Sequence, residues 1–224
     1  MRSESYLKTD NVADKTRLWL SEIRRNVAPR PGLKLAPSKA ALIVIAMLHY
    51  FADRDGRCFL PAAEPVVGNI QRLLEAWRAA DRPVLFTQHC HRGGRDLGML
   101  GKFFSDYIRA GEQEAEIVAP LAPRSDERVV QKTTYDAFLG TGLAELLKAR
   151  DCSQVVITGV LAHMCCETTA RSAFCRGFEV YIPVDGVADV SEERHYQSLL
   201  GLADCVAIIT SMEEVGHQCK QKTL

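Results

Sequence analysis

The chain has 224 residues, of which 47% are hydrophobic and 25% are charged, and its 28 basic residues balance 28 acidic ones. This length suits one sizeable hydrophobic core, so we expect one main domain. A net charge of zero provides no field that would attract nucleic acid, an anionic membrane or a highly charged substrate. The composition therefore favours a protein that acts on a small molecule.

The N-terminal segment and the cysteines bear on the compartment. Asp10, Asp14 and Lys15 interrupt the start of the chain, which has no apolar signal-peptide run, and no later segment has the apolar length that spans a bilayer. The eight cysteines occur singly or as the adjacent pair Cys165 and Cys166, without a CxxC motif, so we expect reduced thiols. These features predict a cytoplasmic protein with no membrane partner.

Residues 1–38 are expected to form an N-terminal arm, and residues 39–224 the main domain. The arm ends in RPGLKLAPS, which is too rich in proline for a continuous helix. We expect the arm to pack either on the domain or on a partner subunit of a homo-oligomer, a dimer or a tetramer.

Apolar runs alternate with helix-like segments along the main domain, which is typical of a parallel sheet covered on both faces. Strands are expected at residues 41–46, 83–88, 128–131, 154–160, 178–183 and 205–210. Helices are expected at residues 69–80, 141–150, 165–177 and 191–204, the third of them capped by Gly177. The predicted fold is a single-domain, three-layer α/β/α structure with a six-stranded, mainly parallel sheet of Rossmann-like order.

The connection from residue 89 to residue 123 is unusually long. It begins with the glycine-rich run HCHRGGRDLGML, and the segment FFSDYIRAGEQEAEI could form one short helix. Such a connection after a strand end can be a lid or pocket wall, to which Phe103, Phe104 and Tyr107 would give an apolar face. Alternatively, these aromatic residues anchor the loop to the core.

Ligands of open parallel sheets bind beyond the carboxyl ends of the strands, where the strand order reverses. In TGVLAHMCCETTARSAF a strand ends at a glycine, and Cys165 stands in the first turn of the helix that follows. A helix N-terminus stabilises a thiolate, and its N–H groups can bind an oxyanion. Cys165 is thus either a nucleophile or a buried structural cysteine. Lys132, after the third strand, is either a solvated charge or a group that favours the thiolate.

Histidines after the second strand raise the question of a metal. His89 and His91 share one face of an extended strand end. They lack the acidic neighbour and the spacing of an HExxH zinc site, and His49 is distant in sequence. We therefore expect pocket or core histidines, no metal and no cofactor, and a structural role for His195.

Three of these segments together resemble the isochorismatase-like cysteine hydrolase superfamily, and the resemblance runs from about residue 39 to the last strand. ALIVIAMLHYF, QKTTYDAFLGTGL and ITGVLAHMCCETTARSAF are similar, in this order, to its first-strand, lysine and nucleophile motifs. The resemblance implies an aspartate, lysine and cysteine triad that works through an acyl-enzyme. Carried over residue by residue, the cysteine is Cys165, the lysine is Lys132, and the aspartate position is occupied by Ala46.

The resemblance also implies an oxyanion hole from the backbone N–H groups of Ala162 and Cys165, and a cis peptide bond between Val160 and Leu161. True isochorismatases resemble the chain in the Ala-His pair of LAHMC, but they usually carry glycine where Cys165 stands, which argues against isochorismate as the substrate. The metal-dependent nicotinamidase branch has an aspartate where His89 stands and a further histidine downstream. That branch is therefore disfavoured.

Ala46 has no group that could accept the Cys165 proton, and losing a positioned general base costs a factor of about 10²–10⁴ in rate. One explanation is a deliberate replacement of the aspartate, so that a substrate is bound without turnover. The other is natural divergence, towards a binding protein or towards an enzyme with a different base, for which His49, His89 and Glu167 are candidates. The intact remaining motifs favour replacement.

We therefore predict a small-molecule hydrolase that cleaves an amide or carbamoyl C–N bond through a Cys165 acyl-enzyme. The alternatives are a vinyl-ether hydrolase of the isochorismatase type and a non-hydrolytic protein that binds a small molecule or a partner. Aromatic residues near the expected site suggest a planar or aromatic substrate. The candidate substrate contacts are His49, Tyr50, Phe51, His89, Phe103, Phe104, Tyr135 and Leu161, with Phe138 nearby in sequence.

Overall fold

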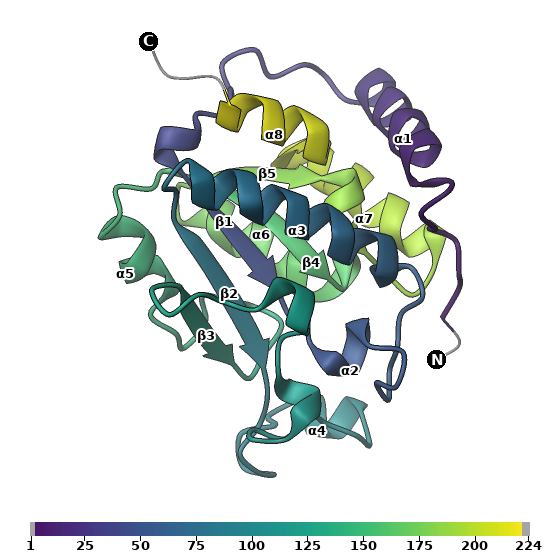
Figure 1. Cartoon of the computed structure of the whole chain (residues 1–224), viewed down its shortest axis with the longest axis vertical. Coiled ribbons are helices and arrows are strands. Elements are labelled where there is room, and N and C mark those ends of the chain that lie inside the picture. Colours follow the sequence, from purple (N-terminus) through teal and green to yellow (C-terminus); the bar gives the residue numbers. More distant parts are fainter. Residues whose placement is uncertain (1–2, 221–224) are drawn as a thin grey trace.

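A seven-stranded sheet forms the centre of the molecule in the computed structural model, which describes residues 3–220 (Figure 1). The strands run in the order β3-β2-β1-β4-β5-β7, and each neighbouring pair is parallel. The strands are β1 Ala40–Ile45, β2 Val84–His89, β3 Arg128–Lys132, β4 Gln154–Val160, β5 Glu179–Pro183, β6 Val187–Ala188 and β7 Ala207–Thr210. The order reverses between β1 and β4, so a ligand site is expected at their carboxyl ends.

The predicted α/β sheet is confirmed, and the sequence missed one short strand. β6 has two residues, and it pairs in parallel with Gly159 and Val160 at the end of β4. So short a strand carries no alternation that a sequence pattern could reveal. Ala46, which we expected inside the first strand, lies one residue beyond β1.

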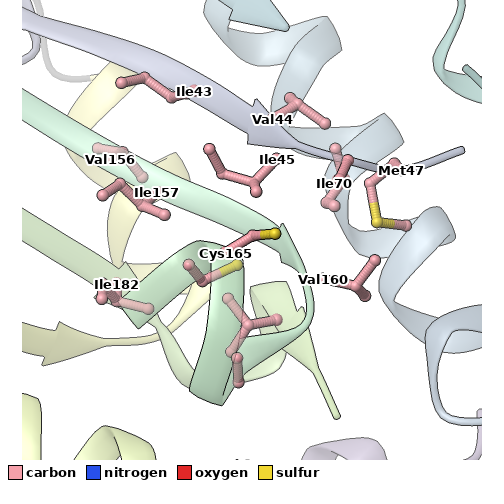
Figure 2. Close-up of a cluster of buried hydrophobic side chains, with 14 of the residues drawn as sticks. Ile43, Val44, Ile45, Met47, Ile70, Val156, Ile157, Val160, Cys165 and Ile182 are labelled. Atoms are coloured by element: carbon pink, nitrogen blue, oxygen red, sulfur yellow. The ribbon is translucent and has the colours of Figure 1, made fainter. Parts of the chain in front are cut away.

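Apolar residues fill β1 and β4 because both strands are covered on both faces, and every residue of the two is buried. Figure 2 shows Ile45 of β1 and Ile157 of β4 in one buried cluster with Ile70 of a covering helix. Gly159 is required here, because its φ is +116° and a Cβ would lie 2.0 Å from the Ile45 carbonyl oxygen.

Helices cover both sides of the sheet. α3 and α8 pack together over one face, and α6 and α7 pack together behind it (Figure 1). The α-helices are α1 Val12–Asn26, α2 His49–Ala52, α3 Ala63–Ala79, α4 Leu100–Phe103, α5 Leu143–Lys148, α6 Glu167–Cys175, α7 Glu192–Cys205 and α8 Met212–Lys220. Between residues 3 and 220, none of these helices is long and apolar enough to cross a bilayer.

The helix expectations need several corrections. α3 begins six residues earlier than predicted, at Ala63, because Pro65 is tolerated in a first helical turn. The expected helix within 103–117 is wrong: α4 ends at Phe103, and only the 3₁₀ turn Gln113–Ala115 follows. α2 and α8 were not expected. Gly177 follows α6 with a φ of +83°, as a C-cap glycine should.

The N-terminal arm packs against its own chain. Its proline-rich end is not helical, but α1 forms earlier in the arm and buries Trp19, Leu20 and Ile23. This helix contacts α7 and β7. The apolar side chains recur at helical spacing, so the helix is stabilised by packing rather than by its sequence propensity. A homo-oligomer remains a prediction.

Candidate active site

Lys132 is the last residue of β3, and its side chain is buried, with 1% exposure. Its Nζ lies 3.1 Å from Cys165 Sγ and donates to the carbonyl oxygen of Thr134 at 2.9 Å. A lysine buried in this way needs acceptors, and a thiolate is the acceptor that would balance its charge. The two residues that the sequence could only place near the same sheet edge are therefore in direct contact.

Cys165 lies in a π-helical turn, Ala162–Cys166, that joins β4 to α6. We expected Cys165 in the first turn of an α-helix, but α6 itself begins only at Glu167. Short π-helical segments are frequent at functional sites, and no sequence period marks them. The Val160–Leu161 peptide bond before this turn is cis, as the resemblance implied. Figure 2 shows Cys165 beside the buried side chains of β1 and β4.

Asp189, which follows β6, holds the turn that carries Cys165. Its carboxylate is fully buried and accepts hydrogen bonds from the backbone N–H of His163 at 2.8 Å and from that of Val190 at 2.7 Å. The same carboxylate lies 2.7 Å from His163 Nδ1. Charge-assisted hydrogen bonds of this kind fix geometry strongly in a buried setting. No local pattern indicated Asp189, because its partner His163 lies 26 positions away in the sequence.

Ala46 is fully buried at the end of β1 and has a φ of +47°. Its backbone N–H donates to the Thr87 carbonyl oxygen of the neighbouring strand at 3.2 Å. This left-handed conformation is uncommon for alanine, whereas aspartate, asparagine and glycine adopt it more readily. The backbone at position 46 is therefore better suited to the aspartate that the resemblance places there than to alanine.

His89 ends β2 beside Lys132. Its Nδ1 lies 3.4 Å from Lys132 Nζ and 3.3 Å from the Thr134 carbonyl oxygen, and its Nε2 lies 3.2 Å from His91 Nε2. Burial, with added repulsion from Lys132 and His91, lowers the pKa of His89 to about 3. The imidazole is therefore neutral at pH 7. Within residues 3–220, no group of three or more His, Cys, Asp or Glu side chains is arranged to hold a metal ion.

Two of the three residues proposed as an alternative general base, His49 and Glu167, bind side chains other than Lys132 and Cys165. His49 pairs with Asp53 at 2.8 Å on α2. Glu167 binds Arg171 at 2.8 Å and accepts a hydrogen bond from Ser198 of α7 at 2.7 Å. His49 and Glu167 were candidate bases because they lie near the motifs in the sequence. The helix that carries each residue decides where its side chain points, and both side chains bind other partners. Of the three, His89 alone contacts Lys132.

A cavity of about 420 Å³ borders His89 and is lined mainly by apolar side chains. Lys132 and Cys165 are not among its lining residues, but Leu161 and Met164, from the stretch that carries Cys165, are. Six of the expected substrate contacts line it: Tyr50, Phe51, His89, Phe104, Tyr135 and Leu161. His49 and Phe103 do not, and Phe103 is 76% exposed because α4 turns its side chain outward. Phe138 also lies elsewhere, stacked on Phe178 at a centroid distance of 6.0 Å.

The sequence missed part of the cavity wall. The missed lining residues come from the segment after α2, the connection after β2, the turn after β4 and the N-terminal arm, and include Arg57, Phe59, Leu97, Met164 and Ser3. Tyr107 also lines the cavity, and the sequence had suggested it for the apolar face of a pocket wall. Arg57 and Asp106 are the oppositely charged pair of the wall, and Arg57 Nη1 lies 2.6 Å from Asp106 Oδ1. Arg57 was not among the predicted site residues. The segment that carries Arg57 has no motif that would have revealed its position.

Comparison with known proteins agrees with this architecture. Residues 40–214 match the family model described as "Isochorismatase domain". Over 179 residues the chain is 35% identical to "Nicotinamidase 3" of Arabidopsis thaliana, with 79% of this chain and 86% of that protein covered. It is 33% identical over 167 residues to "Isochorismatase" of Bacillus subtilis, covering 73% of this chain and about half (52%) of that protein.

A solved structure is also similar. The crystal structure of a cysteine hydrolase from Pseudomonas syringae pv. phaseolicola superposes with a TM-score of 0.81 and 28% identity, covering 84% of this chain and 95% of that one. The residues that match the family model, 40–214, include β1, Lys132, Cys165 and the cis peptide bond between Val160 and Leu161. The chain belongs to the isochorismatase family of hydrolases.

Proposed function

We propose that the Cys165 site hydrolyses the C–N bond of a small uncharged amide or carbamoyl compound, and that Ala46 leaves this chain a weak form of that hydrolase. The observation that carries the proposal is the 3.1 Å contact between Lys132 Nζ and Cys165 Sγ. A buried ammonium beside a thiol favours the thiolate, which is the form that attacks a carbonyl. The relatives named nicotinamidase and cysteine hydrolase support this chemistry.

The reaction would proceed in two steps. Cys165 Sγ bonds to the carbonyl carbon while the carbonyl oxygen takes up negative charge, for which the N–H groups of Ala162 and Cys165 are the proposed donors. The C–N bond then breaks, the amine leaves with a proton, and a thioester remains. Water attacks the thioester and releases the acid and the thiol. A base at position 46 would accept the thiol proton and return it to the amine, and Ala46 lacks that function.

The charges of the cavity support an uncharged substrate. Arg57 is neutralised by Asp106 at 2.6 Å, and its guanidinium also pairs with Glu114. The Lys132 ammonium is directed at Cys165 and at the Thr134 carbonyl oxygen. A substrate with carboxylates, such as isochorismate, would have to displace one of these partners. The apolar lining instead suits a planar or aromatic group.

Ala46 also supports a second candidate function, a protein that binds a small molecule without turnover. Alkylation separates the two. A Cys165 thiolate should react with iodoacetamide near neutral pH faster than the buried thiols of Cys90, Cys152 and Cys166, for each of which burial raises the pKa. Equal slow labelling of Cys165 and these three residues would favour the binding protein.

The direct test is to compare Ala46→Asp with Ala46→Asn on a panel of small amides. Both side chains are compatible with the φ of +47°, but only the carboxylate can accept a proton. We expect Ala46→Asp to raise the hydrolysis rate by a factor of about 10²–10⁴ and Ala46→Asn to have little effect. No gain with Ala46→Asp, or an equal gain with both variants, would contradict the proposal.

A further inference from the structure

The N-terminal arm reaches the cavity from outside the family's catalytic motifs. Ser3 lines the cavity together with Leu161, Met164 and Val190. Leu161 and Met164 belong to the stretch that carries Cys165, and the matched family model begins only at residue 40. A segment outside the matched region therefore contributes to the wall of the site.

Two hydrogen bonds hold this segment along the chain that follows β6. The backbone N–H of Glu4 donates to the carbonyl oxygen of Val190 at 2.8 Å, and the backbone N–H of Glu192 donates to the Glu4 carboxylate at 3.2 Å. Val190 itself lines the cavity. The path of the arm near Ser3 is thus tied to the same residues that border the site.

Tyr6 anchors the arm in the core. Its side chain is 8% exposed, its hydroxyl lies 2.8 Å from His195 Nδ1, and the same hydroxyl accepts the backbone N–H of Asp189 at 2.9 Å. Its ring packs on Trp19 of α1 at a centroid distance of 6.3 Å. His195 is fully buried and also contacts the Val184 carbonyl oxygen at 3.0 Å, which agrees with its expected structural role. An anchor with both hydroxyl partners buried is costly to displace.

We propose that Ser3, held in place by the anchored residues 4–7 of the arm, forms a fixed part of the wall of the substrate cavity and limits the size of the group that can reach Cys165. A small side chain at this position leaves room in the cavity, and a large one would close it from the side of Val190. The part of the proposal that concerns substrates rests on the function proposed above. The placement of the arm is independent of that function.

The test compares Ser3→Trp with Ser5→Trp, because Ser5 lies on the same arm but is exposed and does not line the cavity. Cys165 is labelled with iodoacetamide and with a bulky aromatic iodoacetamide, and the rates are read by peptide mass spectrometry. We expect Ser3→Trp to slow the bulky reagent about tenfold and the small one less than about twofold. Ser5→Trp should change neither rate.

Two results would overturn the proposal: no slowing with Ser3→Trp, or equal slowing of both reagents. If Cys165 of the unaltered chain reacts with neither reagent, the proposed function is contradicted, and a cross-link then decides about the arm. Cys58 is exposed and lines the same cavity, so Ser3→Cys should join to Cys58 through a short bifunctional maleimide, and Ser5→Cys should not. Failure of the Ser3→Cys link would overturn the arm placement.

Discussion

The floor and the wall of the cavity are built from different kinds of structure. The floor consists of the ends of β2 and β3 and the turn after β4, and His89, Leu161 and Met164 of this group line the cavity. Lys132, which contacts His89, and Cys165, which shares the turn with Met164, belong to the floor without lining the cavity. The wall comes from the connection after β2, the segment after α2 and the arm. A strand end and a π-helical turn thus hold Lys132 and Cys165, the proposed reacting groups, whereas irregular segments supply most of the cavity wall.

The strongest test of the floor is removal of the nucleophile. In an Ala46→Asp background, Cys165→Ala should lower the hydrolysis rate by a factor on the order of 10⁴ or more, because the covalent route is lost. The neighbouring Cys166→Ala serves as the control and should cost less than about tenfold, since the hydrogen bond from Lys132 Nζ goes to Cys165 Sγ and not to Cys166. Similar losses in both variants would show that position 165 has no special role.

Lys132 is the second test of the floor. Lys132→Met keeps the volume of the side chain but removes its charge, and in the same background we expect kcat to fall by about 10²–10³ with little change in KM. The alkylation rate of Cys165 should fall as well, because the thiolate loses the ammonium 3.1 Å away. A variant that changed KM alone would place Lys132 in substrate binding instead.

Buried neutral histidines make the fold sensitive to acid. Burial, as the main cause, lowers the pKa of His89 to about 3 and that of His195 to about 4, from an ordinary value of 6.5. Below pH 6.5 the unfolded chain binds protons that the folded chain does not, so stability is lost as the pH falls. Each histidine should cost about 2 kcal/mol of unfolding free energy at pH 5 relative to pH 7.

Urea unfolding at the two pH values measures this loss. A His89→Gln variant should lose less stability between pH 7 and pH 5 than the parent chain, and His217→Gln, a change at an exposed position of α8, should lose as much as the parent. A parent chain with equal stability at both pH values would contradict the burial of His89 and His195 as neutral side chains.

The smallest expected effect concerns the wall. Phe104 lines the cavity, while its neighbour Phe103 does not. Phe104→Ala should therefore raise KM for an aromatic amide about threefold to tenfold and leave kcat nearly unchanged, whereas Phe103→Ala should change neither constant. If kcat fell with Phe104→Ala, the distinction between a reacting floor and a selecting wall would not hold at this residue.

Local patterns in the sequence predicted every strand of the described sheet except the two-residue β6. The apolar runs of β1 and β4 predicted central strands because a strand buried on both faces must be apolar throughout. The motifs around Lys132 and Cys165 indicated the family, and the family model confirms it. The helix ends were less predictable, as Pro65 inside α3 and the π-helical turn before α6 illustrate.

The sequence by itself determined the parallel α/β fold and the family, and it predicts that Ala46 occupies the aspartate position of that family. Only the tertiary structure decided that Lys132 contacts Cys165, that Asp189 holds the turn that carries Cys165, and that Ser3 reaches the cavity. The physical reason is that strands and motifs are encoded by neighbouring residues, whereas these contacts join segments that are distant in sequence. Such contacts form only when the whole core packs, and no local period records them.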